Sequence, residues 1–223
     1  MKQAIVFDLD DTLYSENEYV ISGFQELDRW VRRRFNRQGF FEEAMLLYSK
    51  GHKGNIFNEA LNLLNVQYDY ELILQMLKVY REHLPQIQLY PDALWCLQYA
   101  STKAKTGLIT DGFLVAQKQK VKSLGIHFYL NYIVYSDELG WQYWKPSPIP
   151  YMLMTNGLGI SPAACVYIGD NSHKDFITAK RLGWTTVCVK RTNGIYKNAV
   201  VDPHYLADYE VSSLYEIRNL GFF

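Results

Sequence analysis

Short continuous runs of apolar residues alternate along the chain with longer stretches in which apolar residues recur at helical spacing. Continuous apolar runs are typical of strands buried on both faces of a parallel sheet. They cover residues 3–7, 106–109, 132–135, 165–168 and 185–189, and a weaker sixth run lies near 204–206. Because helices separate the runs, the pattern predicts an α/β domain whose parallel strands are joined by right-handed crossovers.

The interval between the first two expected strands is far longer than a crossover needs, and its pattern of apolar residues differs from that of the strands. Apolar residues recur there at helical spacing over residues 21–35, 40–48, 56–64 and 70–84. Pro85 and Pro91 bracket the return to the strands, since proline disfavours helical geometry at the preceding residue. We therefore expect a helical domain at residues 15–85, inserted into a core of residues 1–14 and 86–223.

Composition narrows the class of protein. The 223 residues carry 23 basic and 23 acidic side chains, so no overall field attracts polyanions, and nucleic acid is not an expected partner. The cysteines at 96, 165 and 188 lack metal-ligand spacing and are expected to be reduced core residues. The first apolar run is too short for a signal peptide, and no stretch is apolar enough to span a membrane. These features predict a soluble cytoplasmic protein without a membrane partner.

Polar residues suited to phosphate or a cation follow the expected strands. Asp8 and Asp10 come directly after the first strand, at the end where open α/β sheets place their ligand crevice. Thr110 follows the second strand, and Asp111 then leads into a helix, so the Thr110 hydroxyl and nearby backbone N–H groups are candidates for binding phosphate. Taken alone, each of these residues could equally be a helix cap or a turn residue.

Later in the chain, Lys145 precedes an expected helix, and Asp170 and Asp175 follow the fourth strand. If the carboxylates converge, two charges about 4 Å apart repel by roughly 4 kcal/mol at an effective dielectric of about 20. Such a cluster favours a cation, and ligands that are all oxygen suit Mg²⁺. Lys145 would supply further positive charge.

The order Asp-x-Asp-x-Thr, Thr, Lys, Gly-Asp-x-x-x-x-Asp, which spans residues 8–175, resembles the haloacid dehalogenase superfamily and in particular its phosphohydrolases. The resemblance implies a Rossmann-like three-layer sandwich with a central parallel sheet. It also implies that the helical insertion is a cap domain. A protein of this kind would be a Mg²⁺-dependent phosphomonoester hydrolase that acts on a small phosphorylated metabolite.

The same resemblance implies a role for each motif residue. Asp8 would be the nucleophile that becomes an aspartyl phosphate, and Asp10 would be the general acid and base. Thr110, Asp111 and Lys145 would bind the phosphoryl group. The metal ligands would be Asp8, the backbone carbonyl of Asp10, and Asp170, with Asp175 supporting Lys145 or a metal-bound water.

Other interpretations stay open. A phosphomutase keeps both acids, whereas a dehalogenase has no leaving alcohol for Asp10 to protonate. A receiver-type signalling module and a catalytically silent binding protein fit less well, because Asp170 and Asp175 follow Lys145 and all six motif residues are present. The chain could be a monomer or a homodimer.

Smaller features carry weaker expectations. Lys53, between two glycines of the insertion, is the candidate contact for the rest of the substrate. Trp141 and Trp144 could pack on the rim of the ligand crevice, but we expect them to anchor their loop in the core. His173 is expected to lie on a surface helix.

Overall fold

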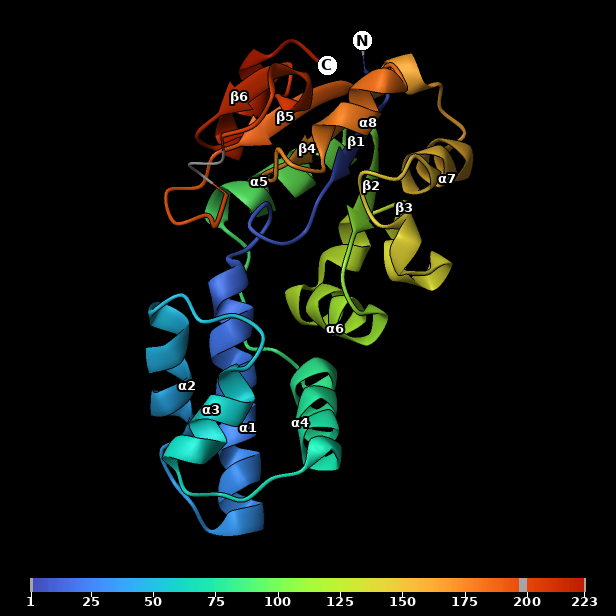
Figure 1. Cartoon of the computed structure of the whole chain (residues 1–223). Coiled ribbons are helices and arrows are strands. Elements are labelled where there is room, and N and C mark those ends of the chain that lie inside the picture. Colours follow the sequence, from blue (N-terminus) through green and yellow to red (C-terminus); the bar gives the residue numbers. More distant parts are fainter. Residues whose placement is uncertain (1, 197–199, 223) are drawn as a thin grey trace. The chain divides into compact units, whose positions relative to one another are not determined.

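The structure is a computed structural model that describes residues 2–196 and 200–222. Its central feature is a six-stranded sheet in the order β3-β2-β1-β4-β5-β6, in which every neighbouring pair is parallel (Figure 1). The strands are β1 (Ala4–Phe7), β2 (Lys105–Thr110), β3 (Tyr132–Tyr135), β4 (Cys165–Gly169), β5 (Thr185–Val189) and β6 (Tyr209–Val211). The five stronger apolar runs are thus confirmed as strands.

Strand order and register determine where the polar strand ends meet. The order reverses at β1, which is the switch point beside which doubly wound sheets bind their ligands. Phe7 at the end of β1 pairs with Leu108 of β2 on one side and with Ile168 of β4 on the other. The residues that follow these three strands therefore emerge at the same edge of the sheet.

Helices flank this sheet in an α/β, Rossmann-like arrangement, as predicted. They are α5 (Pro91–Ser101), α6 (Leu114–Leu124), α7 (Ile149–Leu158) and α8 (Phe176–Arg181). Proline opens α5, and glycines in the left-handed conformation end α6 and α7, at Gly125 and Gly159. Tyr151, Met154 and Trp184 pack with side chains of the central strands into one apolar cluster.

The position predicted for the sixth strand is wrong by a few residues. Pro203–Tyr205 form a short 3₁₀-helix, η5, which begins where the Asp202 side chain accepts a hydrogen bond from the His204 N–H. The strand itself is β6, at the edge of the sheet beside β5. The other 3₁₀-helices are η1 (Ile126–Tyr129), η2 (Ser136–Leu139), η3 (Trp141–Tyr143), η4 (Pro162–Ala164) and η6 (Leu214–Asn219).

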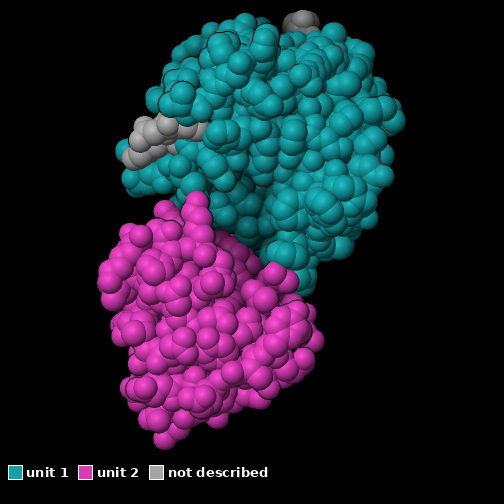
Figure 2. Space-filling view, viewed as in Figure 1, with its two compact units in different colours: residues 1–16, 88–223 teal, residues 17–87 magenta. Residues whose placement is uncertain are grey.

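The chain divides into two compact units (Figure 2). Unit 1 comprises residues 1–16 and 88–223 and contains the sheet, whereas unit 2 comprises residues 17–87. The helices that form unit 2 are α1 (Glu16–Phe35), α2 (Phe40–Ser49), α3 (Ile56–Leu63) and α4 (Tyr70–Glu82). Unit 2 has a core of its own, in which Leu27, Phe40, Leu61 and Met76 are completely buried. Whether unit 2 acts as a cap stays a prediction.

Three further expectations have mixed outcomes. All three cysteines are free and buried, as predicted. The expectation that the tryptophans anchor their loop is wrong for Trp141, which is 78% exposed and lies in η3, where no residue is buried. Trp144 is partly buried, and its indole N–H donates to Asp137 Oδ1 at 3.3 Å. His173 is exposed but lies in a turn before α8 rather than on a helix.

In the described part of the chain, no helix has both the length and the apolar character needed to span a bilayer.

Candidate active site

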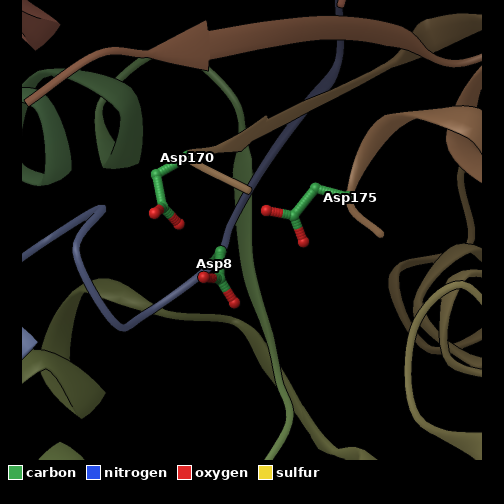
Figure 3. Close-up of side chains that lie close together, drawn as sticks. All are labelled: Asp8, Asp170 and Asp175. Carbon is green, nitrogen blue, oxygen red and sulfur yellow. The ribbon is translucent and has the colours of Figure 1, made fainter. Parts of the chain in front are cut away.

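Three carboxylates meet at the carboxyl ends of the central strands. Asp8 directly follows β1, Asp170 directly follows β4, and Asp175 immediately precedes α8. One carboxylate oxygen from each lies within 4.8 Å of the others, and Figure 3 shows the three side chains pointing toward a common space. The sequence predicts this convergence, and the parallel register of β1 and β4 explains it.

The turn between β4 and α8 holds Asp175 in this cluster. Its Oδ2 accepts a hydrogen bond from the backbone N–H of Asn171 at 3.0 Å, and its backbone carbonyl accepts one from the Tyr151 hydroxyl at 2.8 Å. A Cβ atom on Gly169 would lie 2.5 Å from Asp175 Oδ2, so a larger residue there would displace the carboxylate. Close packing against Asp175 therefore explains why a glycine precedes Asp170 in the motif.

Lys145 supplies positive charge to the cluster. Its Nζ lies 2.5 Å from Asp8 Oδ1 and 2.9 Å from Asp175 Oδ1, and it donates to the Tyr167 hydroxyl at 2.8 Å. The side chain is completely buried. Burial alone would lower the pKa of Lys145, but the charges of Asp175 and Asp8 hold it well above its usual value. The ammonium group therefore stays charged.

One lysine does not neutralise three carboxylates. Burial raises the pKa of Asp8 to about 7, against the opposing effect of Lys145. Burial, and then the charges of Asp8 and Asp175, raise the pKa of Asp170 well above its usual value. These shifts mean that the site holds too much negative charge for its surroundings, so a hard divalent cation would be stabilised by the oxygen ligands gathered there. The residues present thus fit a metal ion.

Thr110 and Asp111 stand at the end of β2, beside the carboxylates. The Thr110 hydroxyl is buried and accepts a hydrogen bond from the Gln117 amide. Both carboxylate oxygens of Asp111 are engaged, one by the backbone N–H of Lys145 at 3.1 Å and the other by Lys174 at 2.9 Å. Burial opposes ionisation of Asp111, but Lys145 and Lys174 lower its pKa below the usual value. Asp111 therefore links the loops that carry Thr110 and Lys145.

The Asp10 carboxylate lies outside the three-carboxylate cluster, as suits a residue expected to bind metal only through its backbone carbonyl. Its Oδ1 accepts hydrogen bonds from the Tyr14 hydroxyl and from Lys120 Nζ, the latter at 2.7 Å. Its Oδ2 accepts one from Gln117 at 2.9 Å. Burial alone would raise the pKa of Asp10, but these donors, Lys120 above all, lower it.

A second layer of contacts holds the loop after β1. The Asp11 carboxylate accepts hydrogen bonds from the backbone N–H groups of Glu16 at 2.9 Å and Ile195 at 3.0 Å. Arg191 donates to the carbonyl of Thr12 at 2.7 Å and pairs with Asp92 at 2.6 Å. Buried pairs of this kind fix backbone position because breaking one leaves an uncompensated charge.

Sequence reasoning missed Gln117, Lys120, Lys174 and Arg191. Gln117 and Lys120 carry a weak signal, since they lie three residues apart on the helix that follows Thr110 and so share a helix face. Lys174 and Arg191 show no comparable pattern. The remaining candidate, Lys53, is exposed on the loop between α2 and α3. This loop belongs to unit 2, whereas the carboxylates belong to unit 1.

A family model described as haloacid dehalogenase-like hydrolase matches residues 5–189. The chain belongs to this family. The glyceraldehyde 3-phosphate phosphatase of Methanocaldococcus jannaschii is 30% identical over an alignment of 229 positions, which covers 99% of this chain and 97% of that protein. The pyrophosphatase PpaX of Bacillus velezensis is 25% identical and covers 97% of this chain and 96% of its own.

Solved structures agree with this haloacid dehalogenase-like assignment. A HAD phosphatase from Thermococcus onnurineus matches with a TM-score of 0.63 and 24% identity, over 98% of this chain and 97% of its own. The putative HAD-hydrolase YfnB from Bacillus subtilis has a TM-score of 0.71 at 16% identity, with 98% of each chain covered. At such identities the likeness establishes the fold. The prediction of this superfamily is confirmed, and the class of enzyme expected from the motifs, a phosphatase, is the class to which the named curated relatives belong.

Proposed function

We propose that this protein is a Mg²⁺-dependent phosphomonoester hydrolase that works through an aspartyl phosphate on Asp8. The observation that carries the proposal is the meeting of Asp8, Asp170, Asp175 and Lys145 within one buried site. Phosphoryl transfer asks a protein mainly to position the reactants and to stabilise negative charge. A carboxylate nucleophile beside a buried ammonium group and further oxygen ligands meets both needs.

In the first step an Asp8 carboxylate oxygen bonds to phosphorus while the bond from phosphorus to the alcohol oxygen breaks. The alcohol oxygen takes a proton from Asp10 as it leaves. Lys145, the Thr110 hydroxyl and the backbone N–H of Asp111 stabilise the phosphoryl oxygens. Asp10 is favoured as a carboxylate in the substrate-free site, but a phosphate dianion adds negative charge nearby and so favours the protonated acid that this step requires.

In the second step a water oxygen bonds to phosphorus and the bond from Asp8 to phosphorus breaks. Asp10, now a carboxylate, accepts a proton from the water, and inorganic phosphate is released. The contacts that lower the pKa of Asp10 suit the deprotonated form from which this second step starts. One residue thereby completes the proton balance of both steps.

Asp8, the backbone carbonyl of Asp10, and Asp170 would hold Mg²⁺. The ion would neutralise part of the charge on the phosphoryl oxygens and keep Asp8 ionised at neutral pH. The raised pKa of Asp8, about 7, supports the need for such a cation. Asp175 pairs with Lys145 and would orient it toward the phosphoryl group.

The substrate class we propose is a small phosphorylated metabolite, beginning with sugar phosphates of the size of glyceraldehyde 3-phosphate. Four of the curated relatives are named glyceraldehyde 3-phosphate phosphatases, and this chain matches 97%, 85%, 86% and 90% of their lengths. We assign unit 2 as the cap that selects the substrate, with Lys53 as a contact for the part of the substrate beyond the phosphate.

A panel of phosphomonoesters assayed with Mg²⁺ and with EDTA tests the proposal. We expect inorganic phosphate to be released from p-nitrophenyl phosphate and from one class of sugar phosphate, and EDTA to abolish the release. A substrate that is isomerised without release of phosphate would indicate a phosphomutase instead. Failure to release phosphate from any ester in the presence of Mg²⁺ would overturn the proposal.

A further inference from the structure

Two side chains of α6 donate hydrogen bonds to the carboxylate of Asp10. Lys120 Nζ lies 2.7 Å from Oδ1, and the Gln117 amide lies 2.9 Å from Oδ2. The same Gln117 nitrogen also donates to the Thr110 hydroxyl. α6 therefore connects the residue proposed as acid and base to the residue proposed to hold the phosphoryl group.

Both donor side chains of these contacts are buried. Lys120 is 5% exposed and Gln117 is 1% exposed, although both types of side chain ordinarily lie at the surface. Burying an ammonium group is costly unless an opposite charge compensates it, and the Asp10 carboxylate is such a partner. The neighbouring Lys118, two residues earlier on α6, instead pairs with Glu138 in solvent. The difference sets Lys120 apart from an ordinary surface lysine.

Donors on both carboxylate oxygens restrict rotation of the Asp10 side chain about its last torsion. A carboxyl group that transfers a proton must lie within hydrogen-bond reach of the atom that receives it, so its orientation affects rate directly. Tyr14 adds a third donor, on Oδ1. Lys120 and Gln117 therefore supply two of the three donors that fix the orientation of Asp10, with a donor on each oxygen.

We propose that Lys120 and Gln117 are positioning residues that orient Asp10 toward the leaving-group oxygen and align it with the phosphoryl group held at Thr110. This inference rests on the proposed function, because it assigns the two residues a part in the same reaction. Neither residue is proposed to touch the substrate. Their contribution should therefore appear only where the reaction depends on Asp10.

Two substrates of nearly the same shape separate that dependence from general damage. p-Nitrophenolate leaves readily without a proton, whereas phenolate needs protonation more. We expect Lys120→Met to lower kcat/KM for phenyl phosphate by about 10–100-fold and for p-nitrophenyl phosphate by less than about threefold. The loss for phenyl phosphate is then part of the roughly 10²–10⁴-fold that a general acid contributes. Gln117→Met should act in the same direction by about threefold to tenfold, because it removes an uncharged donor.

Three further variants complete the test. Lys120→Arg keeps the charge and should recover most of the activity toward phenyl phosphate. Lys118→Met, the matched control on the same helix, should leave the ratio of the two substrates unchanged. In an Asp10→Asn background, Lys120→Met should cause no further loss of kcat/KM for phenyl phosphate, because the residue that it positions no longer transfers a proton.

The two proposals fail in different ways. If the unaltered protein releases phosphate from no ester of the panel in the presence of Mg²⁺, the proposed function is wrong. If it hydrolyses both and Lys120→Met or Gln117→Met lowers them equally or not at all, the function stands and the positioning role is wrong. Should Lys120→Met fold poorly, the ratio measured with Gln117→Met and Lys120→Arg decides the matter.

Discussion

The two units differ in what they bury. In unit 2, Ser22 and His83 are the buried polar residues among those described, and they bond to each other at 3.1 Å within an otherwise apolar and aromatic core. Unit 1 buries several charged side chains around the carboxyl ends of its strands. They include Asp8, Asp111, Lys120, Lys145, Asp170 and Asp175. Buried charge is costly and stabilises a fold poorly, so chemistry explains this part of unit 1 better than stability does.

This contrast makes opposite expectations for the two units. Substitutions among these buried charged residues of unit 1 should change activity far more than stability. Substitutions in the apolar core of unit 2 should lower stability far more than they change the chemical step. The predictions below test these expectations in order of expected size.

Asp8→Asn should have the largest effect. An amide cannot act as the nucleophile, so we expect turnover of p-nitrophenyl phosphate to fall by at least about 10³-fold. The pKa of Asp8 is raised to about 7, which means that the folded protein disfavours its charged form. At pH 8, without metal, thermal unfolding should therefore occur at no lower temperature in the variant. Substantial retained activity would show that Asp8 is not the nucleophile.

Met76→Ala should show the reverse behaviour in unit 2. Met76 is completely buried, and removal of such a side chain leaves a cavity that costs about 2–5 kcal/mol of unfolding free energy. Below the unfolding transition, kcat for p-nitrophenyl phosphate should change by less than about threefold, because this residue takes no part in the chemistry. Lys78→Ala, an exposed position on the same helix, is the control for stability. A large fall in kcat with unchanged stability would contradict the contrast.

Glu16→Gln should have a smaller effect, and one that depends on pH. Burial, with the charge of Asp10 next, raises the pKa of Glu16 to about 7. The folded state therefore disfavours the carboxylate, and this cost is absent below the unfolded pKa of 4.5 and complete above about 7. The variant should thus be more stable than the unaltered protein at pH 8, by about 1–2 kcal/mol after allowance for solvent screening, with no gain at pH 4.

Thermal unfolding of the metal-free protein at several pH values measures this difference. Glu71→Gln, at an exposed position on α4, provides the comparison for removal of a glutamate charge. If Glu16→Gln behaves like Glu71→Gln at every pH, the raised pKa of Glu16 is wrong.

The convergence of the carboxylates at the strand ends could be predicted from sequence because strand and motif are adjacent there. Asp8 and Asp170 directly follow buried strands, and the parallel topology then requires their side chains to meet. β6 was harder to locate because it is a short edge strand in which Tyr209 and Glu210 are exposed. Its apolar signal is therefore weak.

The partners of these residues could not be predicted in the same way. In a sequence, a lysine that pairs with a buried carboxylate looks like a lysine that is solvated, as Lys120 and Lys118 illustrate. Arg191 bonds to the carbonyl of Thr12 and pairs with Asp92, which both lie far from it in the chain. No local sequence pattern predicts such a contact. Tertiary packing alone distinguishes these cases. Trp141 shows the opposite error, since a large aromatic residue expected in the core is exposed.

Lys53→Ala should have the smallest effect and asks whether unit 2 contributes to substrate choice at all. An exposed lysine that contacts an anionic or hydroxylated substrate contributes about 0.2–1 kcal/mol, which corresponds to a change in KM of about 1.4-fold to fivefold. We expect that increase for the preferred sugar phosphate, with kcat for p-nitrophenyl phosphate unchanged. Lys50→Ala, an exposed lysine at the end of α2, is the matched control and should change neither value. If the two variants behave alike across the panel, the loop between α2 and α3 has a structural role, and substrate selection must depend on other residues.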